Sequence, residues 1–116
     1  MNKHDQVKNH LAEGFGLTPM EAMQQFRSMR LATIVDLLRE SGVIIYAARA
    51  RNTRTKITFA FYYEPDAFMA KHMEHFSGRF GTGLLPGLTA WMDDRGWELK
   101  GHYNNRWGQM PPDPTE

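Results

Sequence analysis

The spacing of apolar residues changes at Gly42, and this change limits the folds open to the chain. Up to Gly42, apolar side chains recur at intervals of three and four residues, which is the period of an amphipathic helix. Beyond it, residues 43–51 and 56–63 are rich in β-branched and aromatic residues, with polar Asn52 and Thr53 between them. This pattern indicates a β-hairpin. Helices followed by a hairpin predict an α+β fold.

Two short helices are predicted in the first 26 residues. Residues 3–13 have the spacing of a short amphipathic helix. After them, Thr18 can cap a helix, Pro19 fits the first helical position, and Glu21 can reach back to the cap. A second helix is therefore predicted over residues 19–26.

The third helix, predicted over residues 29–40 with Ser28 as its cap, carries more apolar residues than one stripe requires. The core stripe is assigned to Leu31, Val35 and Leu38. Ile34 and Leu37 lie outside that stripe and can form a protein interface, either a homodimer or a contact with a host protein. Trp107 is a further possible contact. The alternative is that the stripe is wider and the second half covers these residues.

The order of elements is that of a winged helix, in which a hairpin follows a helix-turn-helix. Residues 17–23 (LTPMEAM), 28–32 (SMRLA) and 36–42 (DLLRESG) follow one another in this chain. They resemble the small winged helix-turn-helix domains commonly encoded by phages and prophages, which characteristically read T-P-x-E-A at the second helix and M-R-L near the start of the third. The resemblance covers residues 3–63, and it implies a DNA-binding regulatory or accessory role.

Basic residues gather in the first half, although the formal net charge is only +1. Residues 1–63 carry nine basic and five acidic groups, whereas residues 64–116 carry five basic and eight acidic groups. The predicted hairpin contains Arg49, Arg51, Arg54 and Lys56. The start of the third helix contains Arg27, Ser28, Arg30 and Thr33. In a winged helix, the hairpin contacts phosphates and the third helix enters the major groove of duplex DNA. An ordinary solvated hairpin is the alternative.

The second half is predicted to be an extension, residues 64–108, that packs on the first half. Its pattern predicts a helix over residues 65–77, a second helix over residues 87–94 and then a strand. Three prolines within residues 109–116 predict a disordered tail.

The sequence contains no arrangement typical of an enzyme. It has no cysteine, and no Ser/His/Asp grouping is evident. His72 and His75 have one-turn spacing but lack further ligands nearby in the sequence, so neither a metal nor another cofactor is expected. A non-catalytic DNA-binding protein is the first hypothesis. The alternative is a protein-interaction module or inhibitor that binds a host regulatory or defence protein.

The chain is expected to be cytoplasmic and to make no contact with membranes. Its apolar runs are shorter than the roughly 18 to 20 residues that a membrane span needs. The residues that follow Met1, NKHDQ, are polar rather than apolar as in a signal peptide. A chain without cysteine also suits a reducing compartment.

Overall fold

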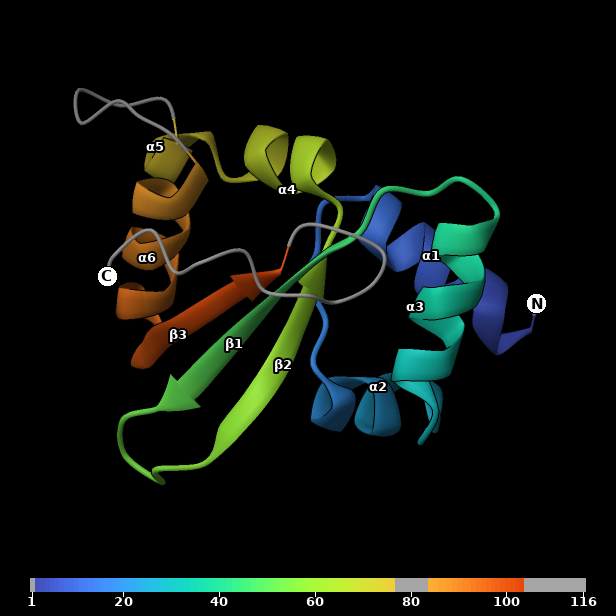
Figure 1. Cartoon of the computed structure of the whole chain (residues 1–116), viewed down its shortest axis with the longest axis horizontal. Coiled ribbons are helices and arrows are strands. Elements are labelled where there is room, and N and C mark those ends of the chain that lie inside the picture. The colour runs from blue at the N-terminus through green and yellow to red at the C-terminus, as the bar shows by residue number, and fades with distance from the viewer. Residues whose placement is uncertain (1, 77–83, 104–116) are drawn as a thin grey trace.

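The computed structural model describes residues 2–76 and 84–103, which form six helices and one three-stranded antiparallel sheet (Figure 1). The elements are α1 (Lys3–Ala12), α2 (Pro19–Phe26), α3 (Leu31–Glu40), β1 (Tyr46–Asn52), β2 (Thr58–Tyr63), α4 (Pro65–Lys71), α5 (Met73–Phe76), α6 (Leu84–Asp94) and β3 (Trp97–Tyr103). The predicted α+β class is confirmed. None of the described helices combines the length and apolar content that crossing a membrane requires.

The capping box predicted for the second helix is present. Thr18 Oγ1 accepts from the Glu21 amide at 3.1 Å, and Glu21 Oε1 accepts from the Thr18 amide at 3.0 Å. The third helix begins later than predicted, because Arg30 rather than Ser28 is its N-cap and no side chain caps it. Ser28 is buried, and its hydroxyl oxygen accepts from the Arg30 amide at 3.2 Å.

The three N-terminal helices surround one apolar core. Its buried residues are Val7, Leu11, Leu17, Ala22, Leu31, Ile34, Val35, Leu38 and Ile45. Ile34 is only 9% exposed, so its assignment to an open interface is wrong. The stripe that faces the core is wider than Leu31, Val35 and Leu38 alone, as is usual for a helix packed into a globular domain. Leu37 remains 49% exposed, as expected for a residue outside the stripe.

The hairpin is part of a larger sheet. β1 is the central strand, because β2 and β3 both pair with it in antiparallel orientation. Leu17, between α1 and α2, exchanges two backbone hydrogen bonds of 2.9 Å with Tyr62 on the far edge of β2. The sheet is therefore tied both to the helical part and to the C-terminal extension.

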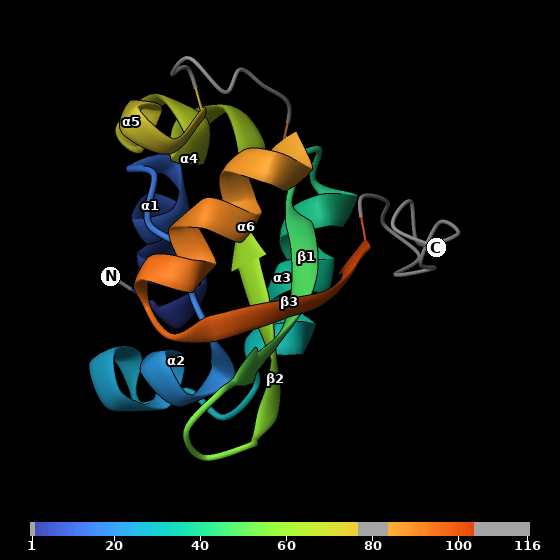
Figure 2. The same cartoon turned by 90° about the vertical axis from the view of Figure 1, so that its left-hand side faces the viewer.

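A second core lies between the sheet and helices α4 to α6. Its buried residues are Ala48, Ala50, Phe61, Tyr63, Phe68, Phe76, Leu88, Trp91 and Met92. Figure 2 shows α6 in front of the sheet. The extension thus packs on the first half, as expected, but the helix predicted over residues 65–77 is interrupted at His72, which separates α4 from α5.

The free energy of unfolding is expected to depend on pH through one buried histidine of the sheet, His102 in β3. The imidazole of His102 is hydrogen-bonded to the Tyr63 hydroxyl, and burial lowers its pKa from 6.5 to about 4. At pH values between about 4 and 6.5, His102 binds a proton more often in the unfolded chain than in the folded one. The contribution of His102 to the free energy of unfolding is therefore complete above pH 6.5 and falls as the pH drops toward 4.

Acidification from pH 7 to pH 5 is expected to lower the free energy of unfolding by roughly 2 kcal/mol through His102 alone. The substitution His102→Gln keeps an acceptor for the Tyr63 hydroxyl but removes the titrating group. Urea unfolding at both pH values should show that acidification lowers the free energy of unfolding less in this variant than in the unchanged protein. An equal loss in the two proteins would contradict the assignment.

Candidate nucleic-acid interface

The turn of the hairpin is organised by Asn52. Its Oδ1 accepts from the amides of Arg54 at 2.9 Å and Thr55 at 3.0 Å, which is the pattern of an Asx turn. Lys56 then takes the left-handed conformation with φ of 67°, and its amide donates to the Asn52 carbonyl at 2.8 Å. The backbone between the cationic side chains is therefore held in a defined shape.

The hairpin turn is also fastened to the extension. The Thr53 amide and the Thr53 hydroxyl both donate to the Gly96 carbonyl, at 3.0 and 2.8 Å. Gly96 lies in the turn between α6 and β3 and has φ of 77°, which favours glycine. This connection restricts movement of the turn relative to the sheet.

Four cations gather on this hairpin, and we name them the hairpin cluster. They are Arg49, Arg51, Arg54 and Lys56. Arg49, Arg54 and Lys56 are exposed, and Arg51 is half-buried. All four of the hairpin residues predicted to contact phosphate are thus accessible to a ligand.

A second group of cations forms where α2 ends, and we name Lys3, Arg27 and Arg30 the helical cluster. Arg27 is the C-cap of α2, with φ of 55°. The ammonium of Lys3 donates to the Arg27 carbonyl at 2.8 Å and so lies beside it. The sequence did not indicate Lys3, because 24 residues separate it from Arg27 and only the packing of α1 brings them together.

The remaining side chains predicted at this end of α3 differ in their access to a ligand. Arg27, Arg30 and Thr33 are exposed, whereas Ser28 is only 4% exposed and is engaged with the Arg30 amide. Ser28 is among the residues near the start of the third helix that are expected to contact nucleic acid, and that expectation is wrong because its side chain is buried. Trp107 lies outside the described residues.

Three of the other basic groups in the described residues form ion pairs with carboxylates, whereas Lys8, like the cations of both clusters, forms none. The ion pairs of lysine and arginine join Arg39 to Asp36 at 3.8 Å, Arg95 to Glu21 at 3.9 Å and Lys100 to Glu98 at 3.8 Å. Lys71 lies over the ring of Phe15. Within residues 2–76 and 84–103, the cations of the two clusters form no ion pair with a carboxylate, although Glu98 is opposite Arg51 in the β1–β3 register. Their charge is therefore not neutralised by carboxylates of the residues that the structure describes.

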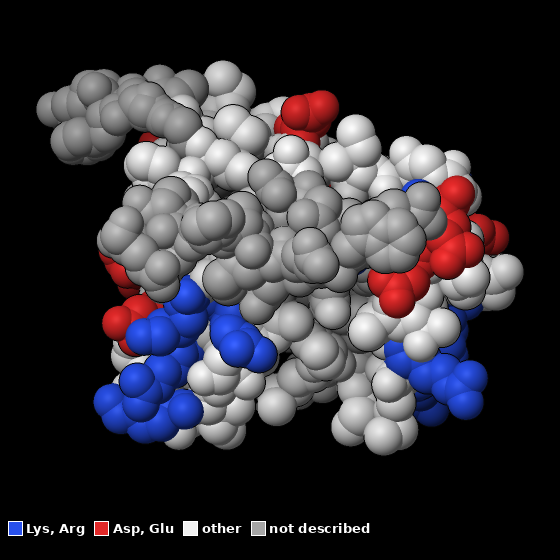
Figure 3. Space-filling view, in the orientation of Figure 1, with Lys and Arg blue, Asp and Glu red and all other residues white. Residues whose placement is uncertain are grey.

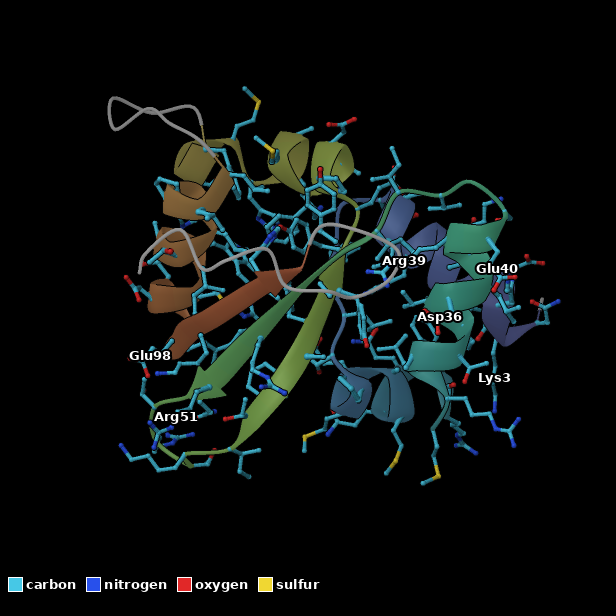
Figure 4. The ribbon with its side chains drawn as sticks, in the orientation of Figure 1. Lys3, Asp36, Arg39, Glu40, Arg51 and Glu98 are labelled. Carbon is cyan, nitrogen blue, oxygen red and sulfur yellow. The ribbon has the colours of Figure 1, made fainter. Side chains whose placement is uncertain are left out.

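The two clusters lie along one edge of the molecule. Figure 3 shows basic surface at the hairpin and again at the helical end, and Figure 4 places Arg51 and Lys3 at opposite ends of this lower edge. The longest extent of the molecule is 40 Å. One turn of B-DNA is about 34 Å long, so a single duplex is long enough to meet both clusters.

The exposed side of α3 beyond its first turn is acidic rather than basic. Asp36 and Glu40 are exposed and give the red surface near α3 in Figure 3, away from the lower edge. Negative charge there opposes close approach of phosphates. The geometry therefore favours contact at the beginning of α3 rather than along its length.

The histidines considered as metal ligands have other contacts. His75 Nε2 lies 2.7 Å from Asp94 Oδ2, and the ring of His72 packs against Phe68 and Trp91. Among the described residues, no group of three or more His, Asp or Glu side chains is arranged to hold a metal ion. His72 is thus engaged in ring packing, and His75 in a contact with Asp94.

Comparisons of the chain with protein-family models, curated proteins and solved structures gave no match.

Proposed function

We propose that this protein is a non-catalytic binder of duplex DNA, which it contacts through the phosphate backbone with the hairpin cluster and the helical cluster. The observation that carries the proposal is the concentration of unneutralised cations on one edge, within the described residues. A cation that replaces counterions at a phosphate gains affinity from their release, without a need for base contacts.

The arrangement of elements supports a winged-helix mode of binding. Helices α1 to α3 precede the hairpin, and the Leu17–Tyr62 bridge fixes the hairpin relative to the helices. In this mode the hairpin is the wing on the phosphates, and the first turn of α3, with Arg30 and Thr33, approaches the major groove. An end-on approach keeps Asp36 and Glu40 away from the duplex.

The regulatory or accessory role, of phage or mobile-element type, rests on the resemblance of residues 17–42 alone. Binding through phosphates suits either role, because the phosphate contacts orient a protein on the duplex while base contacts select the sequence. Arg30 is the exposed residue best suited to select a base, since arginine pairs with guanine through two hydrogen bonds.

The proposal is tested by measuring the affinity of the whole chain for a 20-base-pair duplex at several salt concentrations. With three to seven phosphates contacted, the slope of log K against log salt should lie between about −3 and −6. Fluorescence anisotropy of a labelled duplex gives both quantities. Failure to bind at about 50 mM salt, or binding that does not change with salt, would overturn the proposal.

Exposed methionines favour a second candidate, a protein-interaction module. Met20 and Met23 on α2 are 66% and 51% exposed, and Met29 in the following turn is 85% exposed. Flexible methionine side chains suit variable apolar partners, and the cations of the helical cluster beside them suit an acidic one. A protein partner would stay bound after nuclease treatment, whereas an association through DNA would not.

A further inference from the structure

A cavity of about 450 Å³ is lined by residues of α1, α2 and α6 and of the segments beside them. Figure 2 shows these three helices. The cavity is lined by aromatic rings together with a small number of polar groups, among them His10, Glu21, His72 and Arg95. Its volume falls within the roughly 300 to 1,000 Å³ of pockets that hold small molecules.

Aromatic side chains form one wall of the cavity. Trp91 is 7% exposed, with its ring centroid 5.1 Å from that of Phe61 and 5.5 Å from that of His72. On another side, the ring of His10 stacks on Phe15 at 4.9 Å. These flat surfaces suit a planar ring system, because offset and edge-to-face contacts between aromatic rings are favourable.

The two histidines in the wall add polarity without adding charge. Burial lowers the pKa of both His10 and His72, so the neutral imidazoles predominate at neutral pH. The two rings lie near the backbone of the loop between α1 and α2, His10 near Gly16 and His72 near Gly14.

Arg95 is the cation of the cavity, and its orientation is fixed. Its guanidinium carbon lies 4.6 Å from the ring centroid of Trp91 and 4.8 Å from that of Trp97. Cation–π contacts of this kind use none of the five N–H donors of the guanidinium, which leaves these donors available for an anion. The side chain is 44% exposed, so a ligand entering from solvent can reach it.

Glu21 does not occupy the hydrogen-bond donors of the Arg95 guanidinium. Its Oε2 is 3.9 Å from Arg95 Nη2, which is longer than a hydrogen bond, and its Oε1 accepts from the Thr18 amide in the capping box. A carboxylate of a ligand can therefore form the two parallel hydrogen bonds that arginine prefers. A dianionic phosphate is less suitable, because Glu21 contributes negative charge beside a single cation.

We propose that this cavity binds a planar aromatic carboxylate, with the ring system against Trp91 and the carboxylate on Arg95. The neutral imidazoles of His10 and His72 then border the ring, where each can donate a hydrogen bond to a polar group on the ring or accept one from it. This proposal is independent of DNA binding, since none of the residues in the hairpin or helical clusters lines the cavity.

The probes are 2-naphthoate, its uncharged counterpart 2-naphthamide, and adenosine monophosphate as a phosphate-bearing aromatic ligand. Each is titrated into the whole chain while the NMR signals of the tryptophan indole N–H groups are followed. Naphthoate should shift the Trp91 signal saturably and bind at least about ten-fold more tightly than naphthamide, a difference of about 1.4 kcal/mol. Absence of a saturable shift at millimolar naphthoate, or tighter binding of adenosine monophosphate, would overturn the proposal.

Two variants locate the site. Arg95→Gln should remove the preference for naphthoate over naphthamide, and Gln25→Trp, at an exposed position of α2 that borders the cavity, should block both ligands. Lys100→Gln is the matched control, because it removes one positive charge outside the cavity and should leave naphthoate affinity unchanged. Undiminished binding of naphthoate by folded Arg95→Gln and folded Gln25→Trp would refute the assignment.

Discussion

Replacing Arg51, Arg54 and Lys56 together with glutamine is expected to weaken duplex DNA binding on the order of 100-fold at about 0.1 M salt. If each side chain contacts one phosphate, the slope of log K against log salt should become shallower by up to about 2.7. Anisotropy titrations at four or more salt concentrations measure both effects. The change should be large because these three side chains make up most of the hairpin cluster and have no ion pair within the described residues.

A charge-preserving variant separates charge from local structure. Arg51→Lys, Arg54→Lys and Lys56→Arg keep all three cations, so this triple should retain most of the affinity and the original slope. Lys56 has φ of 67°, a conformation that either basic residue meets with the same difficulty. If the glutamine triple bound with unchanged affinity and slope, the hairpin would have no contact with phosphate.

The substitution Phe61→Ala is expected to lower the free energy of unfolding by about 3 to 5 kcal/mol, because it leaves a large cavity in the second core. Phe61 is 1% exposed, and its ring packs with those of Tyr63, Phe68, Trp91 and Trp97. A loss of this size is a large part of the stability of a domain of this length. Urea denaturation followed by circular dichroism measures it.

Phe59→Ala on the same strand is the matched comparison. Phe59 is half-buried and its ring contacts that of Trp97. Its replacement should therefore lower the free energy of unfolding clearly less than that of Phe61. The ring of Phe61 also occupies space beside Gly16, where a Cβ would come within 1.8 Å of it. Equal losses in the two variants would show that Phe61 does not have the central role in packing that its contacts indicate.

Local signals in the sequence were sufficient for much of the secondary structure. The capping box of Thr18 and Glu21 depends on residues three apart, and the structure contains it as predicted. The hairpin is likewise present, since alternation of side chains along β2 reflects which face of the strand is buried. Errors arose where burial depended on distant segments, as for Ile34, whose place in the core depends on how α1 and α3 pack.

The candidate site was predictable only in part. The hairpin cations are close in sequence, and a turn brings them together. Lys3 joins Arg27 only through the packing of α1 against α2, and the cavity beside Arg95 depends on helices and a strand drawn from both halves. Side chains so distant along the chain leave no local pattern that identifies them as neighbours.

By itself, the sequence determined which short segments become helices and strands, because capping, turn chemistry and apolar period act over a few residues. Only the tertiary structure decided that β1 is the central strand of one sheet and that the cations of the two clusters lie on the same edge. It also decided that Arg95 lies over the rings of two tryptophans beside a cavity. These features require contacts over tens of residues, and their geometry is set by how two cores pack around one sheet.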